Sequence, residues 1–321
     1  MSTQSAPLVS VGIVTWHSAA QLPDCLSALR QQTHANLEVI VVDNASRDDS
    51  AAQAAGWAAA RTIGNTENRG YCGGHNQAIH AAQGAYYLAL NPDVQMQPDY
   101  IAALIDALET RPDYGSAAGK LLQAIEPQPI IDTVGLFIDR QRRQYLRGHG
   151  EMDRGQYARA GEVFGVDGAA PLYRRAMLDD IAVDGEYFDE SFFVHKEDVD
   201  LAWRARLFGW RCWYTPEAVA LHPRSFRPGR RAPMAPAIRV HAVKNRYLLL
   251  LKNESRAGWR RDALPILAYD LQILAYLLLF ERPSLGAFPL LRRAWARAQA
   301  WRRDIWRRAR TDEIELLTWF R

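Results

Sequence analysis

Hydrophobic and polar positions form blocks along the first 90 residues, and the blocks change period from one to the next. Residues 8–15, 37–43 and 84–90 are short apolar runs rich in β-branched or aromatic side chains, which predicts buried strands. Between them, residues 23–30 open with Pro and Asp, as helices do, and an Ala-rich segment follows residue 50. Strands that alternate with helices are typical of a parallel sheet covered on both faces. The pattern predicts an α/β fold.

Polar side chains follow two of these strands at the point where each strand ends. Asp43 closes the second strand, and Asn91, Pro92 and Asp93 follow the strand at 84–90. Pro92 has no N–H to donate and therefore ends the ladder. In open α/β sheets, ligands bind outside the carboxyl ends of strands, where a carboxylate can hold a hard cation together with a phosphate. The alternative is a turn in which Asp93 only caps the next helix.

Residues 65–79 contain three glycines between a strand-like segment and a helix. Glycines there allow close approach of the backbone to a ligand. The segment lacks the Gly-x-Gly-x-x-Gly spacing and is not a P-loop, which argues against a dehydrogenase or a kinase. The alternative is a flexible loop that caps a helix.

The second half of the chain is less regular. Residues 100–109 form an amphipathic pattern that predicts a helix, and the polar region 127–165 is expected to contain a hairpin around 137–140. Residues 166–175 are expected to enter a helix. A helix with an apolar stripe is predicted from residue 197, and residues 210–222 read as a strand that returns to the sheet.

Beyond residue 240 the chain is predicted to be helical. Residues 264–280 are nearly all apolar, but Asp270 and Gln272 interrupt them, and the run falls short of the roughly 20 apolar residues that a membrane span needs. Residues 291–310 carry an apolar stripe with Trp295 and Trp301, surrounded by arginines. A basic amphipathic helix with tryptophans is typical of a membrane-surface anchor. The alternatives are a helix that packs on the protein body and a homodimer contact.

Composition adds an asymmetry of charge. The chain has 321 residues and a net charge of +3, but residues 1–222 carry 18 Lys/Arg against 28 Asp/Glu, whereas residues 223–321 carry 21 against 8. A basic C-terminal part suggests an anionic partner, either nucleic acid or lipid. Nucleic acid is the weaker interpretation, because no known binding motif is present and the arginines follow a helix face.

The N-terminal residues and the cysteines indicate in which cellular compartment the protein is expected. Residues 1–7 lack the basic start and apolar core of a signal peptide. The three cysteines lie far apart and form no Cys-x-x-Cys motif, which fits reduced thiols. We therefore expect a cytoplasmic protein, held on the inner face of the cell membrane by its basic helix.

Four motifs together resemble family 2 glycosyltransferases, and most of all the rhamnosyltransferase-like branch that builds bacterial cell-surface glycans. The resemblance runs from about residue 8 to about residue 255. It implies a GT-A fold, with a nucleotide-sugar half (1–120), an acceptor half (121–237) and a helical extension (238–321). The motifs, in order, are Val14-Thr15-Trp16-His17, Val42-Asp43-Asn44-Ala45-Ser46, Asn68-Arg69-Gly70-Tyr71 through Asn76, and Asn91-Pro92-Asp93.

The resemblance implies roles on the donor side. Asn91-Pro92-Asp93 stands where many relatives carry Asp-x-Asp, so Asp93 would bind the metal, Mg²⁺ or Mn²⁺. Asp43 would hydrogen-bond the donor's base, with Thr15 and Trp16 against it. The family usually has Tyr or Phe and then Asn at positions 16 and 17, and often Asn at 75. The full donor-side set is Thr15, Trp16, Asp43, Asn68, Gly70, Asn76, Asn91 and Asp93.

The resemblance also implies an acceptor side. The run at 188–201 resembles the family's acceptor-site signature, in which the aspartate of the Glu-Asp pair is the catalytic base, here Asp198. Glu197 and Gly168 would lie beside it. His222 would complete the metal site, and Arg224 and Arg227 of the loop after it would fold over the donor diphosphate. The alternatives are acids that only cap a helix, an ordinary histidine after a strand, and a linker with no ligand.

The implied activity is inverting transfer of a sugar from a nucleotide-diphosphate sugar to a glycan or lipid-linked acceptor. The branch suggests dTDP-rhamnose first, while mannose, galactose and glucose stay open. One rival is a sugar-phosphate nucleotidyltransferase, which would need an N-terminal Gly-rich, basic loop where this chain has Thr15-Trp16-His17-Ser18. The other is a non-catalytic glycosyltransferase-like subunit that recruits partners to the membrane.

Overall fold

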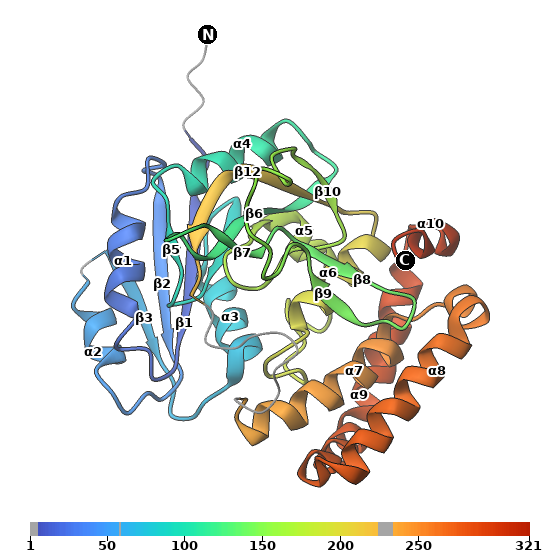
Figure 1. Ribbon diagram of the computed structural model, residues 1–321. Helices are drawn as coiled ribbons and strands as arrows, with labels where there is room; N and C mark the ends of the chain where they lie inside the picture. Colours follow the sequence, from blue (N-terminus) through green and yellow to red (C-terminus); the bar gives the residue numbers. More distant parts are fainter. Residues whose placement is uncertain (1–5, 58, 224–233) are drawn as a thin grey trace.

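A ten-stranded mixed sheet passes through the body of the protein, with helices against both faces (Figure 1). The computed structural model describes residues 6–57, 59–223 and 234–321. The strand order is β10-β12-β6-β11-β4-β1-β2-β3, with β5 added to β12 and β7 added to β6. The strands of this sheet are β1 (Val9–Thr15), β2 (Leu37–Asp43), β3 (Ala60–Gly64), β4 (Tyr86–Leu90), β5 (Gln95–Met96), β6 (Tyr114–Ala124), β7 (Ile130–Thr133), β10 (Gly161–Val163), β11 (Leu172–Arg174) and β12 (Arg211–Leu221).

The parallel part of the sheet confirms the strands predicted from the N-terminal pattern. β1 lies between β2 and β4, parallel to both, and β3 extends the same arrangement. Alternate residues of β2 enter different cores: Val39 and Val41 pack with α1 (Leu22–Arg30) and α4 (Tyr100–Glu109), and Ile40 and Val42 pack on the other face. Burial on both faces explains why these strands read as continuous apolar runs. Their carboxyl ends meet at one edge, with Thr15 opposite Asp43.

The glycines at 70–74 allow close packing at the start of a helix. They lie in the first turns of α3 (Gly70–Ala81), not in a loop before it. A Cβ at Gly74 would stand 2.6 Å from Val14 of β1, and one at Gly70, where φ is +69°, would stand 2.4 Å from the carbonyl oxygen of Phe193. The missing side chains therefore let the helix and the 193 loop approach each other and the sheet.

The acceptor half adds antiparallel pairing that the sequence did not indicate. β11 inserts between β4 and β6 and runs antiparallel to both. The prediction that 166–175 enters a helix was therefore wrong up to residue 174, and α5 (Arg175–Ile181) begins only after the strand. The expected hairpin is confirmed as β8 (Leu136–Ile138) paired with β9 (Gln144–Leu146). The remaining helices of the body are α2 (Ser50–Ala55) and α6 (Glu197–Leu207).

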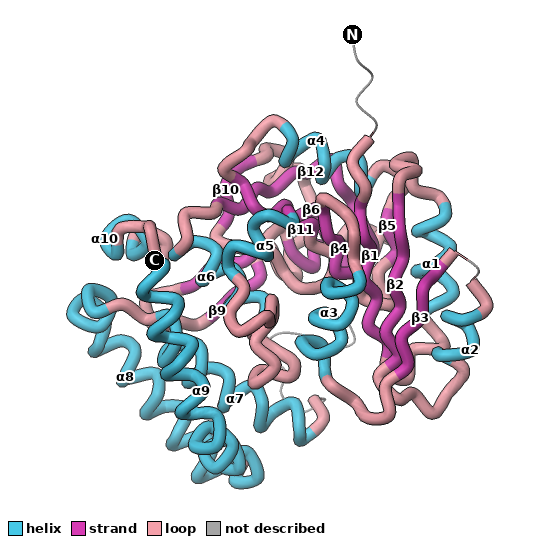
Figure 2. Tube along the Cα trace, turned by 180° about the vertical axis from the view of Figure 1, so that it is seen from behind, coloured by secondary structure: helices cyan, strands magenta, loops and turns pink. Residues whose placement is uncertain are grey.

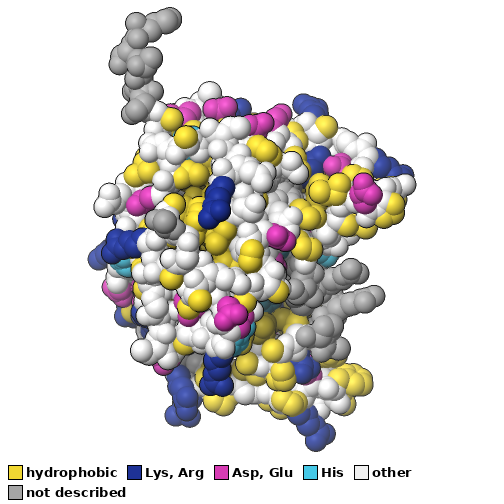
Figure 3. Space-filling model, turned by 90° about the vertical axis from the view of Figure 1, so that its left-hand side faces the viewer, with side chains coloured by type: hydrophobic (Ala, Val, Ile, Leu, Met, Phe, Trp, Pro, Cys, Tyr) yellow, Lys and Arg dark blue, Asp and Glu magenta, His cyan; other side chains and the backbone are white. Residues whose placement is uncertain are grey.

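The C-terminal extension lies at the end of the sheet far from α1 and α2, in both views of the chain (Figures 1 and 2). The extension consists of α7 (Pro236–Asn253), α8 (Arg256–Leu279), the 3₁₀ helix η1 (Arg282–Gly286), α9 (Ala287–Arg308) and α10 (Glu313–Leu317). On the opposite side of the body, which carries α1 and α2, basic and acidic side chains are interspersed (Figure 3).

The C-terminal part of the apolar stripe of α9 packs on protein, which corrects the prediction of a membrane-facing stripe there, whereas Trp295 is 46% exposed. Ala298, Trp301 and Ile305 are fully buried and belong to the main core. Arg302 donates to the carbonyl oxygens of Leu251 and Glu254, and other α9 arginines bond to the body. Three of the α9 arginines, Arg297, Arg302 and Arg308, are therefore engaged by the body, whereas Arg292, Arg293, Arg303 and Arg307 stay exposed. α8 is instead the one described helix that is long and apolar enough to cross a membrane, with a mean hydropathy of 1.5 over its most apolar window.

Buried ion pairs join the extension to the acceptor half. Nζ of Lys252 on α7 lies 2.6 Å from Asp189 and 2.9 Å from Asp200 of α6. Arg142, after β8, is also buried and pairs with Glu254 and Asp262. Because charged groups that lose a buried partner are costly, these contacts fix α7 and the start of α8 to the body.

Candidate active site

Two buried polar atoms lie at the edge where β1 and β2 end. Thr15 Oγ1 and Asp43 Oδ1 make no hydrogen bond within the described part of the chain, although both residues are buried. The other oxygen of Asp43 accepts from the N–H of Ser46 at 3.0 Å. Trp16 follows directly and is 53% exposed. Buried polar groups are normally paired, so these two unpaired oxygens at the sheet edge have the character of a ligand contact.

Two other residues predicted on the donor side, Asn68 and Asn76, form hydrogen bonds within the protein. Asn68 accepts from the N–H of Gly70 at 2.7 Å, in the turn that opens α3. Asn76 is buried, and its amide group bonds to the backbone of Tyr187 and Phe188 and to Glu190. These bonds use all the donors and acceptors of that amide. Asn76 therefore has no group left for a donor and holds the 187–190 segment, a correction to its predicted place in the site.

Asp93 lies in the turn after β4, as the sequence indicated, and faces His222. The side chain of Asp93 is 25% exposed, and its Oδ1 lies 3.4 Å from Nε2 of His222. Two contacts hold this turn: the N–H of Asn91 donates to Ala169 at 2.8 Å, and β5 pairs with the end of β12, which His222 follows. The structure thus brings together the two residues expected to bind the metal.

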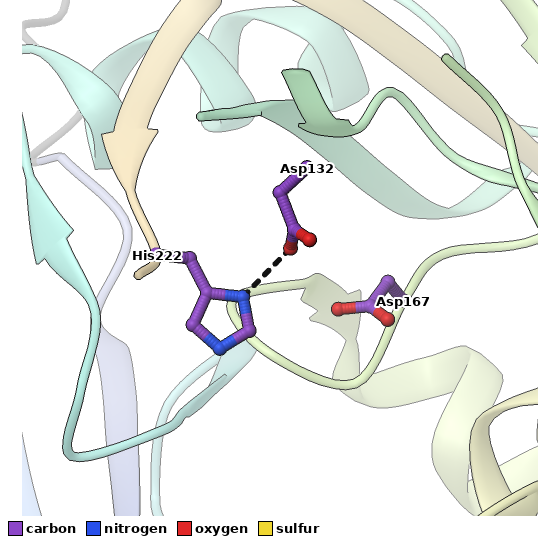
Figure 4. Close-up of side chains that lie close together, drawn as sticks. All are labelled: Asp132, Asp167 and His222. Atoms are coloured by element: carbon purple, nitrogen blue, oxygen red, sulfur yellow. Dashed lines mark hydrogen bonds and ion pairs between the residues drawn. The ribbon is translucent and has the colours of Figure 1, made fainter. Parts of the chain in front are cut away.

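A second carboxylate, Asp132, lies on the other side of the same histidine (Figure 4). Its Oδ2 is 2.8 Å from Nδ1 of His222, and its Oδ1 is 3.4 Å from Nδ1 of His149. Asp132 belongs to β7, which pairs with β6, and the N–H of His222 donates to Leu122 of β6. Ligand atoms of Asp132, Asp167 and His222 lie within 4.8 Å of one another.

Sequence reasoning missed Asp132 and Asp167. One signal was present: Asp132 interrupts the apolar run Ile130-Ile131-Asp132-Thr133-Val134, and an acid at a strand-core position needs a buried partner. Asp167 gave no comparable signal, because it lies in an irregular loop.

The residues at this edge fit a divalent cation. Carboxylate oxygens suit Mg²⁺ and Mn²⁺, and an imidazole adds a nitrogen ligand that Mn²⁺ accepts more readily than Mg²⁺. A metal-binding histidine commonly gives its second ring N–H to a carboxylate, as Nδ1 of His222 can to Asp132. Nε2 of His222 and the carboxylate of Asp93 are then the groups directed at the ion, with Asp167 close by.

The predicted catalytic pair begins α6, and both side chains are buried. Burial raises the pKa of Glu197 well above its ordinary value, and the adjacent carboxylate of Asp198 raises it further. This shift disfavours the charged form of Glu197 in the folded protein. Gly168 lies beside Asp198, since a Cβ at Gly168 would stand 3.7 Å from Cβ of Asp198. Asp167 thus lies near Asp132 and His222, and the next residue, Gly168, lies near Asp198.

The backbone before α6 is strained. Phe193, His195 and Lys196 all have positive φ, between 65° and 75°, although none is glycine. Such conformations cost about 1–3 kcal/mol each and persist only where surrounding contacts hold them. The side-chain N–H₂ of Asn245 on α7 supplies these contacts, because it donates to the carbonyl oxygens of Phe192, Val194 and His195. Arg224 and Arg227, expected at the diphosphate, lie outside the described residues.

Residues 10–182, more than half of the chain, match the family model described as glycosyl transferase family 2. The chain belongs to this family. A similar protein is the N-acetylglucosaminyl-diphospho-decaprenol L-rhamnosyltransferase of Mycobacterium tuberculosis, which is 28% identical over 291 residues, covering 82% of this chain and 88% of the relative. The expected family and its rhamnosyltransferase-like branch are confirmed, and the protein is a glycosyltransferase.

Solved structures place the fold among GT-A proteins. GalNAc-T7 with UDP, GalNAc and Mn²⁺ gives a TM-score of 0.58 at 9% identity, over 78% of this chain and 48% of that one. The mannosyltransferase PcManGT from Pyrobaculum calidifontis, in complex with GDP-Man and Mn²⁺, gives 0.53 at 20% identity, over 92% and 78%. The predicted α/β GT-A fold with a C-terminal helical extension is confirmed.

Proposed function

We propose that this glycosyltransferase moves a sugar from a nucleotide-diphosphate sugar to a glycan or lipid-linked acceptor, with inversion and with Mg²⁺ or Mn²⁺ bound. One observation carries the proposal. The metal-site residues Asp93, His222 and Asp132 and the base candidate Asp198 converge on the loop at 167–168. An enzyme that must bind a diphosphate beside a general base needs such an arrangement.

On the donor side, the unpaired oxygens of Thr15 and Asp43 receive the nucleoside, and Trp16 covers it. Asp93 and His222 hold the cation, which when bound neutralises the charge of the departing diphosphate. The similar mycobacterial protein is named as an L-rhamnosyltransferase, so dTDP-rhamnose is the first donor to test. Arg224 and Arg227, which lie outside the described residues, are proposed to bind the diphosphate.

On the acceptor side, Asp198 takes the proton from the acceptor hydroxyl while the new glycosidic bond forms at the anomeric carbon. The bond to the diphosphate oxygen breaks on the opposite face, so the product is inverted. A positioned base of this kind contributes about 10²–10⁴-fold. Gly168 lies beside Asp198, and the hydroxyl group of Tyr71, which donates to the carbonyl oxygen of Gly168 at 2.7 Å, lies at the same place.

The test is a thermal-shift panel of nucleotide diphosphates and nucleotide sugars with Mn²⁺, Mg²⁺ or EDTA. A native-state ligand at 100 times its Kd stabilises the protein by about 2.7 kcal/mol. We expect a metal-dependent shift with one nucleotide, and its loss in Asp93→Ala but not in Asp106→Ala, an exposed carboxylate of α4. A shift that Asp93→Ala leaves unchanged would remove Asp93 from the metal site.

We further propose that the protein works as a peripheral protein on the inner face of the cell membrane, through its C-terminal extension. The basic excess of residues 223–321 and a lipid-linked acceptor both favour that location. The rival is a recruiting subunit that has no catalytic activity. Hydrolysis of the donor that is lost when Asp198 is replaced would show that the protein is catalytic. Release of diphosphate from a nucleoside triphosphate would instead indicate a nucleotidyltransferase.

A further inference from the structure

We propose that α8, rather than α9, docks the protein on an anionic membrane, lying in the plane of the surface. Five of its leucines follow a 3-4-3-4 spacing, which places them in one stripe along the helix. Leu264 is 82% exposed and Leu271 is 68% exposed. The stripe, called here the leucine face, consists of Leu264, Leu267, Leu271, Leu274 and Leu278.

No exposed charge interrupts the leucine face. Between residues 262 and 281 the one Asp, Glu, Lys, Arg or His is Asp270, whose carboxylate is 18% exposed and lies 2.7 Å from the guanidinium group of Arg246. Leu279 and Phe280, both at least 70% exposed, extend the apolar surface at the C-terminal end. A continuous apolar surface of this kind marks a contact with lipid or with another protein.

The other side of α8 is fixed to the body, so the leucine face points outward. Ile266 and Leu277 are buried, and the ring of Tyr269 lies under the guanidinium groups of Arg143 and Arg246. α8 is also the outermost helix of the extension in both views (Figures 1 and 2). With 24 residues it is about 36 Å long and could reach across a bilayer. Spanning would, however, pull these contacts and the buried Asp262–Arg142 pair apart, so α8 lies on the membrane.

Charge decides between lipid and a second copy of the chain. Arg256 and Arg260 stand at the start of α8 and Arg282 stands just past its end, all exposed. Arg256 and Arg260 form no ion pair with other described residues. Two copies joined through this face would bring like charges together at the helix ends in either orientation, which is unfavourable. Anionic headgroups at both ends of an apolar stripe are favourable instead.

Docking through α8 would also orient the proposed reaction site, and this consequence rests on the proposed function. α7 leads directly into α8, and its Asn245 and Lys252 hold the segment from 189 to 200 that contains Asp198. A membrane that holds α8 therefore holds this segment at a set distance from the bilayer. A lipid-linked acceptor is confined to the same surface.

The experiment is co-sedimentation of the full chain with vesicles of phosphatidylcholine, with and without phosphatidylglycerol, at low and high salt. We expect binding to the anionic vesicles that falls with salt. Leu271→Glu should weaken it roughly tenfold or more, because a charge enters the apolar boundary. Ile314→Glu on α10, where the side chain is 70% exposed, is the matched control and should bind as the unaltered protein does.

Two outcomes would overturn the proposal. One is absence of vesicle binding by the unaltered protein, or equal binding by Leu271→Glu. The other is a dimer in vesicle-free buffer, seen by sedimentation velocity, that Leu271→Glu converts to a monomer. An unchanged thermal unfolding curve shows that the variant is folded. Nucleotide binding, measured in the same samples, reports on the transferase site separately and does not depend on α8.

Discussion

Oδ2 of Asp132 lies 2.8 Å from Nδ1 of His222, and both side chains are buried. Because one ring nitrogen is engaged by Asp132, the other points at Asp93. Carboxylate, imidazole and carboxylate thus form a line that crosses from β7 to the turn after β4. In the proposed metal site, Asp132 would act on the ion through the histidine, by fixing the tautomer and orientation of the imidazole.

Asp132→Asn is expected to weaken Mn²⁺ binding about 10–100-fold, as loss of such a supporting carboxylate does elsewhere. The amide has similar shape but no charge to favour an N–H at Nδ1 of His222. Calorimetric titration with Mn²⁺ and nucleotide measures the effect, and excess Mn²⁺ should restore donor binding. The exposed Glu151→Gln is the control. Equal Mn²⁺ affinity in Asp132→Asn would show that the pair is only structural.

Asp198→Asn should lower kcat by at least about 10²-fold and leave donor binding intact, because the amide cannot accept the proton. Glu197→Gln should change kcat far less, because burial and the carboxylate of Asp198 raise the pKa of Glu197 and so disfavour its charged form. Single-turnover transfer assays measure both variants. A larger loss in Glu197→Gln than in Asp198→Asn would reverse the assignment of the base.

Asp43→Ala is expected to weaken nucleotide binding by about 1.5–3 kcal/mol, the usual worth of a hydrogen bond to a charged group. The loss should be the same with and without metal, because Asp43 lies with the nucleoside rather than with the diphosphate in the proposed pose. Titration with a nucleoside monophosphate, which lacks the diphosphate, measures the contribution of Asp43 to nucleoside binding alone. Asp49→Ala, an exposed carboxylate of the following turn, should bind normally.

The stability of the protein should fall with acid below pH 6.5 through His75. Burial lowers the pKa of this histidine to about 3, whereas an unfolded histidine titrates at 6.5. Between these values the unfolded chain takes up a proton that the folded chain refuses, so the free energy of unfolding decreases by up to about 1.4 kcal/mol per pH unit.

His75→Asn removes this titration and can still bond to Tyr87, whose hydroxyl lies 2.7 Å from Nδ1. Urea unfolding at pH 7 and pH 5 should therefore show a smaller pH effect in the variant. The exposed His80→Asn serves as control and should keep the full effect. An equal pH effect in His75→Asn would assign the acid sensitivity to other groups.

Lys252→Met should destabilise the protein by about 3–5 kcal/mol, because it leaves buried carboxylates without their cation. Burial by itself would raise the pKa of Asp189, but Lys252, the N–H of Ser191 and Arg297 together lower it to about 2. Urea unfolding at neutral pH measures the loss. Arg303→Met on the exposed side of α9 should cost little. A small effect in Lys252→Met would mean that the extension is not fixed by this network.

Local patterns were sufficient for the parallel half of the molecule. Strands buried on both faces leave continuous apolar runs, and turn residues such as Pro92 mark where they end, so Thr15, Asp43 and Asp93 could be placed at one edge from sequence. β11 could not be predicted, because three residues between two longer strands carry no period of their own. Asp132 could be suspected from its apolar neighbours, but not assigned to His222.

The sequence by itself determined the family, the α/β architecture and the chemistry of the residues available at the sheet edge. Only the tertiary structure decided which of them meet, since Asp132, Asp167 and His222 come from segments up to 90 residues apart. It also decided which helix is exposed. The apolar stripe of α9 and the nearly continuous apolar run of α8 are both visible in the sequence, but a pattern shows that a surface is apolar and not what covers it. Packing against α7 and the body buries the first and leaves the second open.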